Sequence, residues 1–162
     1  MLMYLNTRKI KALANKLIKE HNLTIPIDLF YLAERLKIEI VETKKLKTDG
    51  FTLPIHNEEY NDIALVIIKK DISNTRKRFT IAHEIYHALE HRNLVSPYAV
   101  NNDFIEQEAN IFAAELLMPA NEVKRAIFED KIFYLDDLAY LFYVSKQAMQ
   151  IRLKRLGFSF IL

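Results

Sequence analysis

The residues best suited to chemistry form a short run near the middle of the chain, HEIYH over residues 83–87. In an α-helix, His83 and His87 lie about 40° apart around the axis and one turn apart along it, so both imidazoles can reach one ion. Glu84 falls about 100° from His83, where its carboxylate can act on a water molecule at that ion without binding the ion itself. The H-E-x-x-H pattern thus predicts a zinc site with Glu84 as the catalytic acid/base.

The segment around this motif is predicted to be helical for reasons that do not involve the histidines. Ser73 or Asn74 can cap a helix that runs to about His91. Ile81 and Ile85 fall on the side of that helix away from the motif histidines. We therefore expect the helix to pack its apolar side on a core while the histidines face a cleft.

Two histidines leave one protein ligand to find, because catalytic zinc usually takes three and keeps a fourth position open. The chain has no cysteine, so this ligand should be a carboxylate. In the segment FIEQEANIFAAELLMP, Glu106 and Glu108 lie about 200° apart on a helix, and only one can face the metal. Glu106 shares its side with alanines and with Asn110, whose amide could orient a ligand histidine. Glu108 shares a side with Glu115, as expected of a solvated edge. We predict Glu106 as the third ligand, with Glu108 as the alternative.

The remaining histidines are weaker candidates. His91 lies about 80° round the helix from His83 and lacks the longer loop spacing of the HExxHxxGxxH pattern. We expect it beside the site or on the surface, and we assign no role to His21 or His56, which are isolated in the sequence.

This ligand set predicts hydrolysis of a peptide bond. Zinc makes water a stronger acid and polarises a carbonyl group. Glu84 would accept the proton of the attacking water and then pass it to the leaving amine. The expected activity is that of a zinc-dependent peptidase.

The elements that must position these residues follow from apolar periodicity and from capping and turn signals. An amphipathic helix is expected after Asn6 or Thr7, and Asp28 is expected to open a second helix through Leu36. Three strands and five helices should follow: strands at about 38–41, 51–53 and 63–68, and helices at about 73–91, 103–118, 121–129, 135–142 and 145–156. The predicted class is α+β, a mostly helical single domain with a small β-sheet.

Composition narrows the class of protein further. The 162 residues are 51% hydrophobic, enough for one cooperative core. The formal charge of +2 is too weak to imply a nucleic-acid partner unless a local patch concentrates it. The first residues are interrupted by charge every few positions, so they fit neither a signal peptide nor a membrane span. We expect a cytoplasmic protein with no membrane partner.

Several segments together resemble the ImmA/IrrE family of metallo-endopeptidases. RFTIAHEIYHALEH resembles the active-site helix of that family, and EQEANIFAAELLMP resembles its ExxAN-x-FAAELLMP segment. The resemblance extends to LAYLFYVSKQAMQIRLKRLGF near the carboxyl end and, more weakly, to TIPIDLFYLAERLKIEIVE near the amino end. It therefore spans most of the chain.

The resemblance implies a zincin-like active-site helix with zinc on His83, His87 and Glu106. It implies Glu84 as the catalytic acid/base, and it places Asn110 where thermolysin-like ExxxD segments have an aspartate that supports a ligand. Members of this family typically act on helix-turn-helix repressors in phage or mobile-element switches. A repressor-like protein is therefore the implied substrate.

The carboxyl end offers a competing interpretation. We expect residues 1–162 to form one metallopeptidase domain, with a catalytic body over about 1–130 and a helical subregion over about 131–162. This subregion resembles a helix-turn-helix with its turn at Val144-Ser145. Its second helix would present polar side chains from Lys146, Gln147, Gln150, Arg152, Lys154 and Arg155. Nucleic-acid binding is thus possible but not favoured, because many apolar positions fit a helix pair packed on the body. A toxin-antitoxin-like interaction module that keeps the metal for structure is a further alternative.

Overall fold

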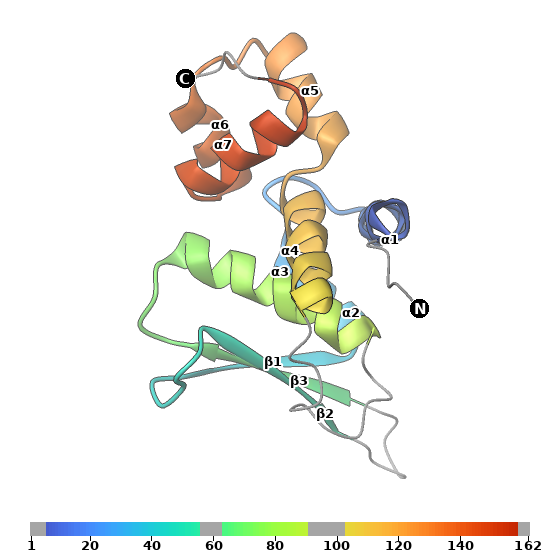
Figure 1. The fold of residues 1–162 in the computed structure, drawn as a ribbon, viewed down its shortest axis with the longest axis vertical. Helices are drawn as coiled ribbons and strands as arrows, with labels where there is room; N and C mark the ends of the chain where they lie inside the picture. The colour runs from blue at the N-terminus through green and yellow to red at the C-terminus, as the bar shows by residue number, and fades with distance from the viewer. Residues whose placement is uncertain (1–5, 56–62, 91–102, 159–162) are drawn as a thin grey trace.

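The computed structural model describes residues 6–55, 63–90 and 103–158, and within them it has the predicted α+β class (Figure 1). Helices outnumber strands, and the only sheet in these ranges has three strands. In chain order the elements are α1 (Thr7–Glu20), α2 (Leu29–Arg35), β1 (Ile38–Thr43), β2 (Gly50–Ile55), β3 (Ile63–Lys69), α3 (Asn74–Glu90), α4 (Asp103–Leu117), α5 (Ala120–Phe128), α6 (Leu135–Phe142) and α7 (Lys146–Arg155).

The predicted caps begin several of these helices. The Asn6 side chain accepts a hydrogen bond from the Lys9 amide at 3.1 Å, and Asp28 accepts one from the Tyr31 amide at 2.9 Å. Ser145 begins α7 in the same way. Each cap satisfies an amide that has no partner inside the helix, so the sequence fixes where the helix starts.

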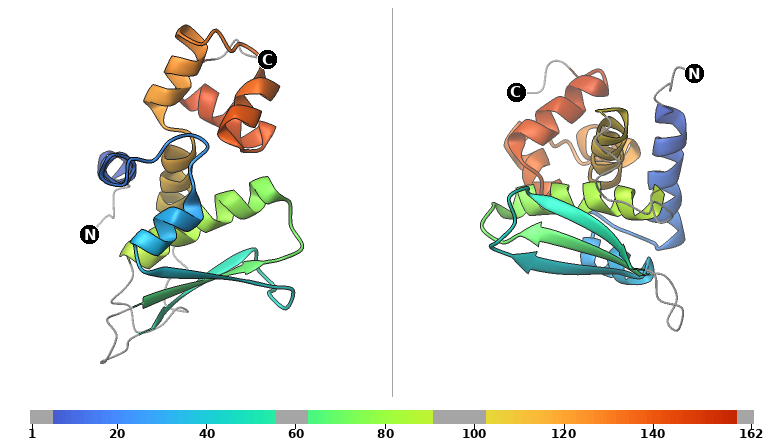
Figure 2. Two further views of the ribbon diagram at one scale, coloured as in Figure 1. Left: turned by 180° about the vertical axis from the view of Figure 1, so that it is seen from behind. Right: turned by 60° about the horizontal axis from the view of Figure 1, so that its bottom comes forward.

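The sheet has the order β1-β3-β2, with β1 parallel and β2 antiparallel to the central strand. Alternate residues of β3, Ala64, Val66 and Ile68, are buried beneath α3. All the described helices lie on this side of the sheet (Figures 1 and 2). The side chain of Thr52 in β2 consequently reaches α3, which carries the HEIYH motif.

Helix α4 packs across α3 and beside α1 (Figure 2). Ala109 and Ala113 of α4 are fully buried, as expected of small side chains that allow two helices to approach closely. Ile85 of α3 and Phe112 of α4 are also fully buried. The two helices that carry the predicted ligands therefore share one core.

The carboxyl-terminal helices are joined to this core by a buried ion pair. The Arg152 guanidinium donates to the Glu115 carboxylate at 2.6 and 2.7 Å and, through Nε, to the Met118 carbonyl oxygen at 2.9 Å. Two expectations from the helix faces are therefore wrong: Glu115 is not on a solvated edge, and Arg152 does not point outward from α7. Each charge can be buried because the other satisfies it.

None of the described helices combines the length and the apolar character that crossing a bilayer requires.

Candidate metal centre

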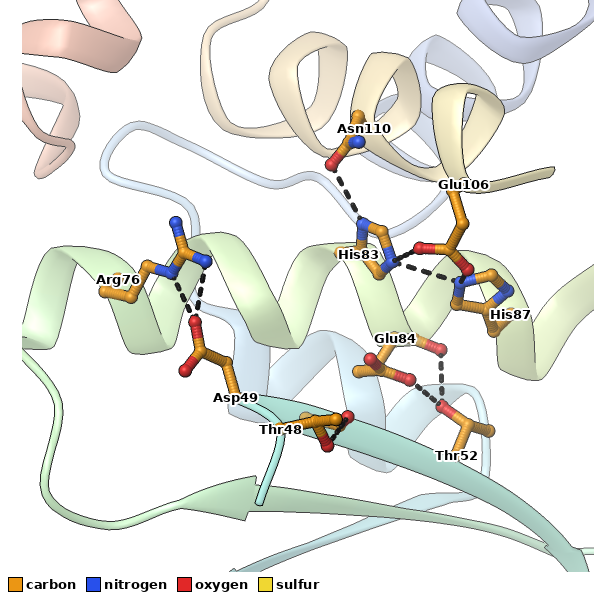
Figure 3. A network of polar contacts seen from close by, with 10 residues as sticks. Thr48, Asp49, Thr52, Arg76, His83, Glu84, His87, Glu106 and Asn110 are labelled. Atoms are coloured by element: carbon orange, nitrogen blue, oxygen red, sulfur yellow. Dashed lines mark hydrogen bonds and ion pairs between the residues drawn. The ribbon is translucent and has the colours of Figure 1, made fainter. Parts of the chain in front are cut away.

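The structure brings the two motif histidines together with Glu106 (Figure 3). His83 and His87 lie one turn apart on α3, and their Nε2 atoms are 3.0 Å from each other. Each of these nitrogens is 3.2 Å from one oxygen of the Glu106 carboxylate, which projects from the first turn of α4. The imidazoles are 14% exposed and the carboxylate 47%, so the group lies at the surface with one side open to solvent.

The spacing of these three groups fits a small divalent metal. Zinc bonds of about 2.0–2.1 Å at tetrahedral angles place neighbouring ligand atoms about 3.3 Å apart. The two histidine nitrogens are 3.0 Å apart, and each is 3.2 Å from a different oxygen of Glu106. With one ligand atom taken from each residue, the three atoms lie within 4.8 Å of one another, a separation that small side-chain shifts can close. Two imidazole nitrogens and one carboxylate are also a ligand set that zinc accepts. The residues present therefore suit such an ion.

Asn110 holds one of the histidines in a fixed orientation. Its Oδ1 is 3.1 Å from His83 Nδ1, one turn of α4 beyond Glu106. An amide oxygen only accepts, so this contact favours the tautomer of His83 with the proton on Nδ1, which leaves the lone pair of Nε2 for a metal ion. The predicted supporting role of Asn110 has this geometric basis.

Glu84 lies on the neighbouring side of α3, toward the sheet (Figure 3). The Thr52 hydroxyl is 2.6 Å from Glu84 Oε2, to which it donates, and 3.1 Å from the Glu84 carbonyl oxygen. Burial raises the pKa of the Glu84 carboxyl and outweighs the opposing effects of the Thr52 hydrogen bond and of His83. A carboxyl group with a raised pKa is suited to taking and releasing a proton near neutral pH.

Two residues around Glu84 were missed from the sequence. No sequence pattern indicated Thr52, because its position beside α3 depends on the packing of the sheet. Gly50 could have been singled out, since it is one of only two glycines in the chain. A Cβ at position 50 would overlap Thr80 Cγ2 and lie 3.1 Å from Glu84 Oε1. Gly50 therefore leaves the room in which Thr80 and Glu84 pack.

Glu108, the alternative third ligand, has a different partner. Tyr86 is buried on α3, and its hydroxyl donates to Glu108 Oε2 at 2.9 Å. Burial and this carboxylate raise the pKa of the tyrosine. Glu108 is not in the group formed by the two histidines and Glu106. His91 and His56 lie outside the described residues, and His21 caps the far end of α1.

Known proteins with similar sequences identify the family of this chain. The sequence model of the IrrE N-terminal-like domain, Peptidase M78, matches residues 33–154. The chain is 28% identical over 138 residues to "Uncharacterized immunity region protein 2" of Bacillus phage phi105, covering 82% of this chain and 81% of that protein. It is 23% identical over 156 residues to "Metallopeptidase ImmA" of Bacillus subtilis (strain 168), covering 93% and 88% respectively.

A solved structure described as a Mycobacterium tuberculosis transcriptional regulator has a similar fold. The TM-score is 0.63 at 18% identity, over 91% of this chain and 46% of that one. The chain thus spans about half the length of that regulator, and the likeness concerns the fold alone.

Proposed function

Because the chain belongs to the family of the IrrE N-terminal-like domain, Peptidase M78, we propose that it is a zinc-dependent endopeptidase. The observation that carries the proposal is the convergence of His83, His87 and Glu106 within 3.2 Å of one another. Buried Glu84 follows His83 on α3. Family membership supports a metal-dependent peptidase, and the choice of zinc rests on the ligand set.

The residues would divide the chemistry among themselves. His83, His87 and Glu106 would hold the ion, and Asn110 would keep His83 in the required tautomer. A bound zinc ion supplies Lewis acidity toward water and toward the carbonyl of the scissile bond. Glu84 accepts a proton from the attacking water and returns it to the leaving amine nitrogen. The Thr52 hydroxyl fixes the Glu84 carboxylate during both transfers.

The proposed substrate is a helix-turn-helix repressor of a phage or mobile element, met in the cytoplasm. Support comes from the names of the relatives, one an immunity region protein of a phage and the other a metallopeptidase. A regulatory protein is therefore the class of partner to test first.

For the organisation of the chain, we propose one metallopeptidase domain over residues 1–162. In it, about 1–130 form the catalytic body and about 131–162 a helix-turn-helix-like subregion. The buried pair between Arg152 and Glu115 supports a subregion that is packed on the body.

A regulatory module that keeps the metal for structure is the second candidate. Helices α6 and α7 are joined by a short turn, and Lys146, Lys154 and Arg155 are exposed on α7. The fold is also shared with a transcriptional regulator. A DNA-binding α7 would require retention of duplex DNA that is lost in Lys154→Ala/Arg155→Ala.

The deciding experiment has two steps. After zinc loading and desalting, mass spectrometry of wild type and His83→Ala should give about one zinc per wild-type chain and a sharp loss in the variant. Glu84→Gln should then keep the zinc but fail to cleave a candidate repressor that the wild type cleaves. If Glu84→Gln retains full biological activity, the structural role of the metal replaces the peptidase. If neither chain retains zinc, the site is not a metal centre.

A further inference from the structure

The weak net charge of the chain conceals an uneven distribution. Two segments, 42–49 and 69–78, together hold eight lysines and arginines and three acidic residues, a net charge of +5. The whole chain carries only +2, so the rest of it carries −3. Nothing in the order of the sequence brings these two segments together, because they are about twenty residues apart.

The sheet places both segments at one end of the molecule. The Lys70 amide donates to the Thr43 carbonyl oxygen at 2.9 Å, and the Lys69 amide donates to the Asp49 carbonyl oxygen at 2.8 Å. The connection between β1 and β2 therefore lies beside the connection between β3 and α3 (Figure 1). We call this surface the basic end; its lysines are Lys44, Lys45, Lys47, Lys69 and Lys70.

The acidic residues of the basic end are largely neutralised from within α3. Asp49 is paired with Arg76 at 2.6 Å (Figure 3), and Glu42 is paired with Lys77 at 2.8 Å. Asp71 has only a loose contact with Lys44, at 3.9 Å. Because residues of α3 neutralise two of the three carboxylates, most of the five lysines keep an unneutralised positive charge.

Four lysines of the basic end have no acidic partner within ion-pair distance among the described parts of the chain. Lys45, Lys47 and Lys70 are exposed, and Lys69 is half-buried. Like charges gathered at one end of a molecule repel one another, and an anion with several charged groups would relieve that repulsion. The basic end is therefore suited to a polyanion.

The side chains around these lysines indicate which polyanion. Protein interfaces are generally poor in lysine and depend on aromatic anchors, and neither basic segment contains an aromatic residue. Flexible ammonium groups spread along two neighbouring chain segments suit phosphates repeated along a backbone. We propose that the basic end binds the phosphodiester backbone of nucleic acid, without reading its sequence.

The basic end has no residue in common with the metal centre or with the exposed residues of α7. Arg76 and His83 are seven residues apart on α3, which a rise of about 1.5 Å per residue makes about 10 Å along the helix. A nucleic acid at the basic end would thus pass near the centre without entering it. The binding does not require the proposed peptidase, so it can be tested whether or not that function holds.

The test measures binding of labelled duplex DNA and of single-stranded RNA by fluorescence anisotropy, as a function of salt. Four phosphate contacts would lower the wild-type affinity about 100-fold between roughly 50 and 200 mM salt. Replacing Lys45, Lys47, Lys69 and Lys70 by Gln should weaken binding at low salt at least tenfold and flatten the salt dependence. A control of equal charge replaces Arg8, Lys16, Lys19 and Lys124, which are exposed on α1 and α5, and should bind as the wild type does.

Four other outcomes overturn the proposal. The basic end is not the site if the wild type binds neither nucleic acid, or if both four-residue variants weaken binding equally. Loss of binding only in Lys154→Ala/Arg155→Ala would assign it to α7 instead. Binding of polyglutamate in place of both nucleic acids would identify an acidic protein as the partner. Preference for DNA or RNA distinguishes the source of the backbone, and either one upholds the proposal.

Discussion

Removing either partner of the buried ion pair between Arg152 and Glu115 should strongly destabilise the folded protein. Their side chains are 3% and 7% exposed, so neither charge is solvated in the folded protein. Removing one partner of such a pair generally costs about 3–5 kcal/mol, because the other charge stays buried. The two single variants should not be equal, since the surroundings of the two residues differ.

Arg152→Met leaves Glu115 with Lys11, whose Nζ is 3.6 Å away and whose side chain is 54% exposed. We therefore expect a cost near the lower end, about 3 kcal/mol. Within the described residues, Glu115→Leu leaves the Arg152 guanidinium with the Met118 carbonyl oxygen as its one acceptor, so its cost should approach about 5 kcal/mol. The double variant removes both charges and should cost only about 1–2 kcal/mol, chiefly for the carbonyl left without a donor.

Urea unfolding followed by circular dichroism measures all three variants, and for a chain of this size the single variants should also lower Tm by about 6–20 °C. Arg125→Ala is the control, because its pairs with Glu122 and Asp130 are exposed and should contribute little to stability. The reasoning is refuted if a single variant costs no more than this control. It is equally refuted if the double variant is as unstable as the sum of the two singles.

Three further predictions concern the surroundings of Glu84 and His83. Gly50→Ala should lower the free energy of unfolding by about 1–3 kcal/mol, because the added Cβ overlaps Thr80 Cγ2. In urea unfolding, Thr80→Ser should partly restore the stability of this variant. An unchanged unfolding midpoint in Gly50→Ala would contradict the close packing. In metal-free protein, Glu84→Gln should be more stable than wild type at pH 8 but not at about pH 4. The raised pKa of Glu84 means that its protonated form fits the fold, so wild-type stability is lost as pH rises through the folded pKa; a pH-independent difference in unfolding free energy would refute this. Asn110→Ala should weaken zinc binding about 10- to 100-fold in a chelator competition, because His83 loses its partner, whereas Asn110→Asp should retain it; equal affinities in all three proteins would remove Asn110 from the site.

The local pattern of the sequence was enough to predict the helices and the spacing of the candidate ligands. Apolar periodicity and capping residues act within one or two turns, so α2 and α6 begin and end within about one residue of their predicted bounds. The four-residue spacing of His83 and His87, and of Glu106 and Asn110, is also a local property of a helix. The choice of Glu106 over Glu108 followed from the same geometry, and the structure groups Glu106 with the histidines.

Only the tertiary structure decided which distant residues meet. Thr52 reaches Glu84 because β2 lies at the edge of the sheet beneath α3, and no periodicity along the chain indicates that contact. The helix faces predicted that Glu115 and Arg152 would be exposed to solvent. A charged side chain can face inward when a partner from another helix satisfies it, and here the partner is 37 residues away in the sequence. The two segments with a net charge of +5 meet at the basic end only because β1 and β2 both pair with β3. Sequence periodicity describes each element by itself, whereas these contacts depend on how the elements pack.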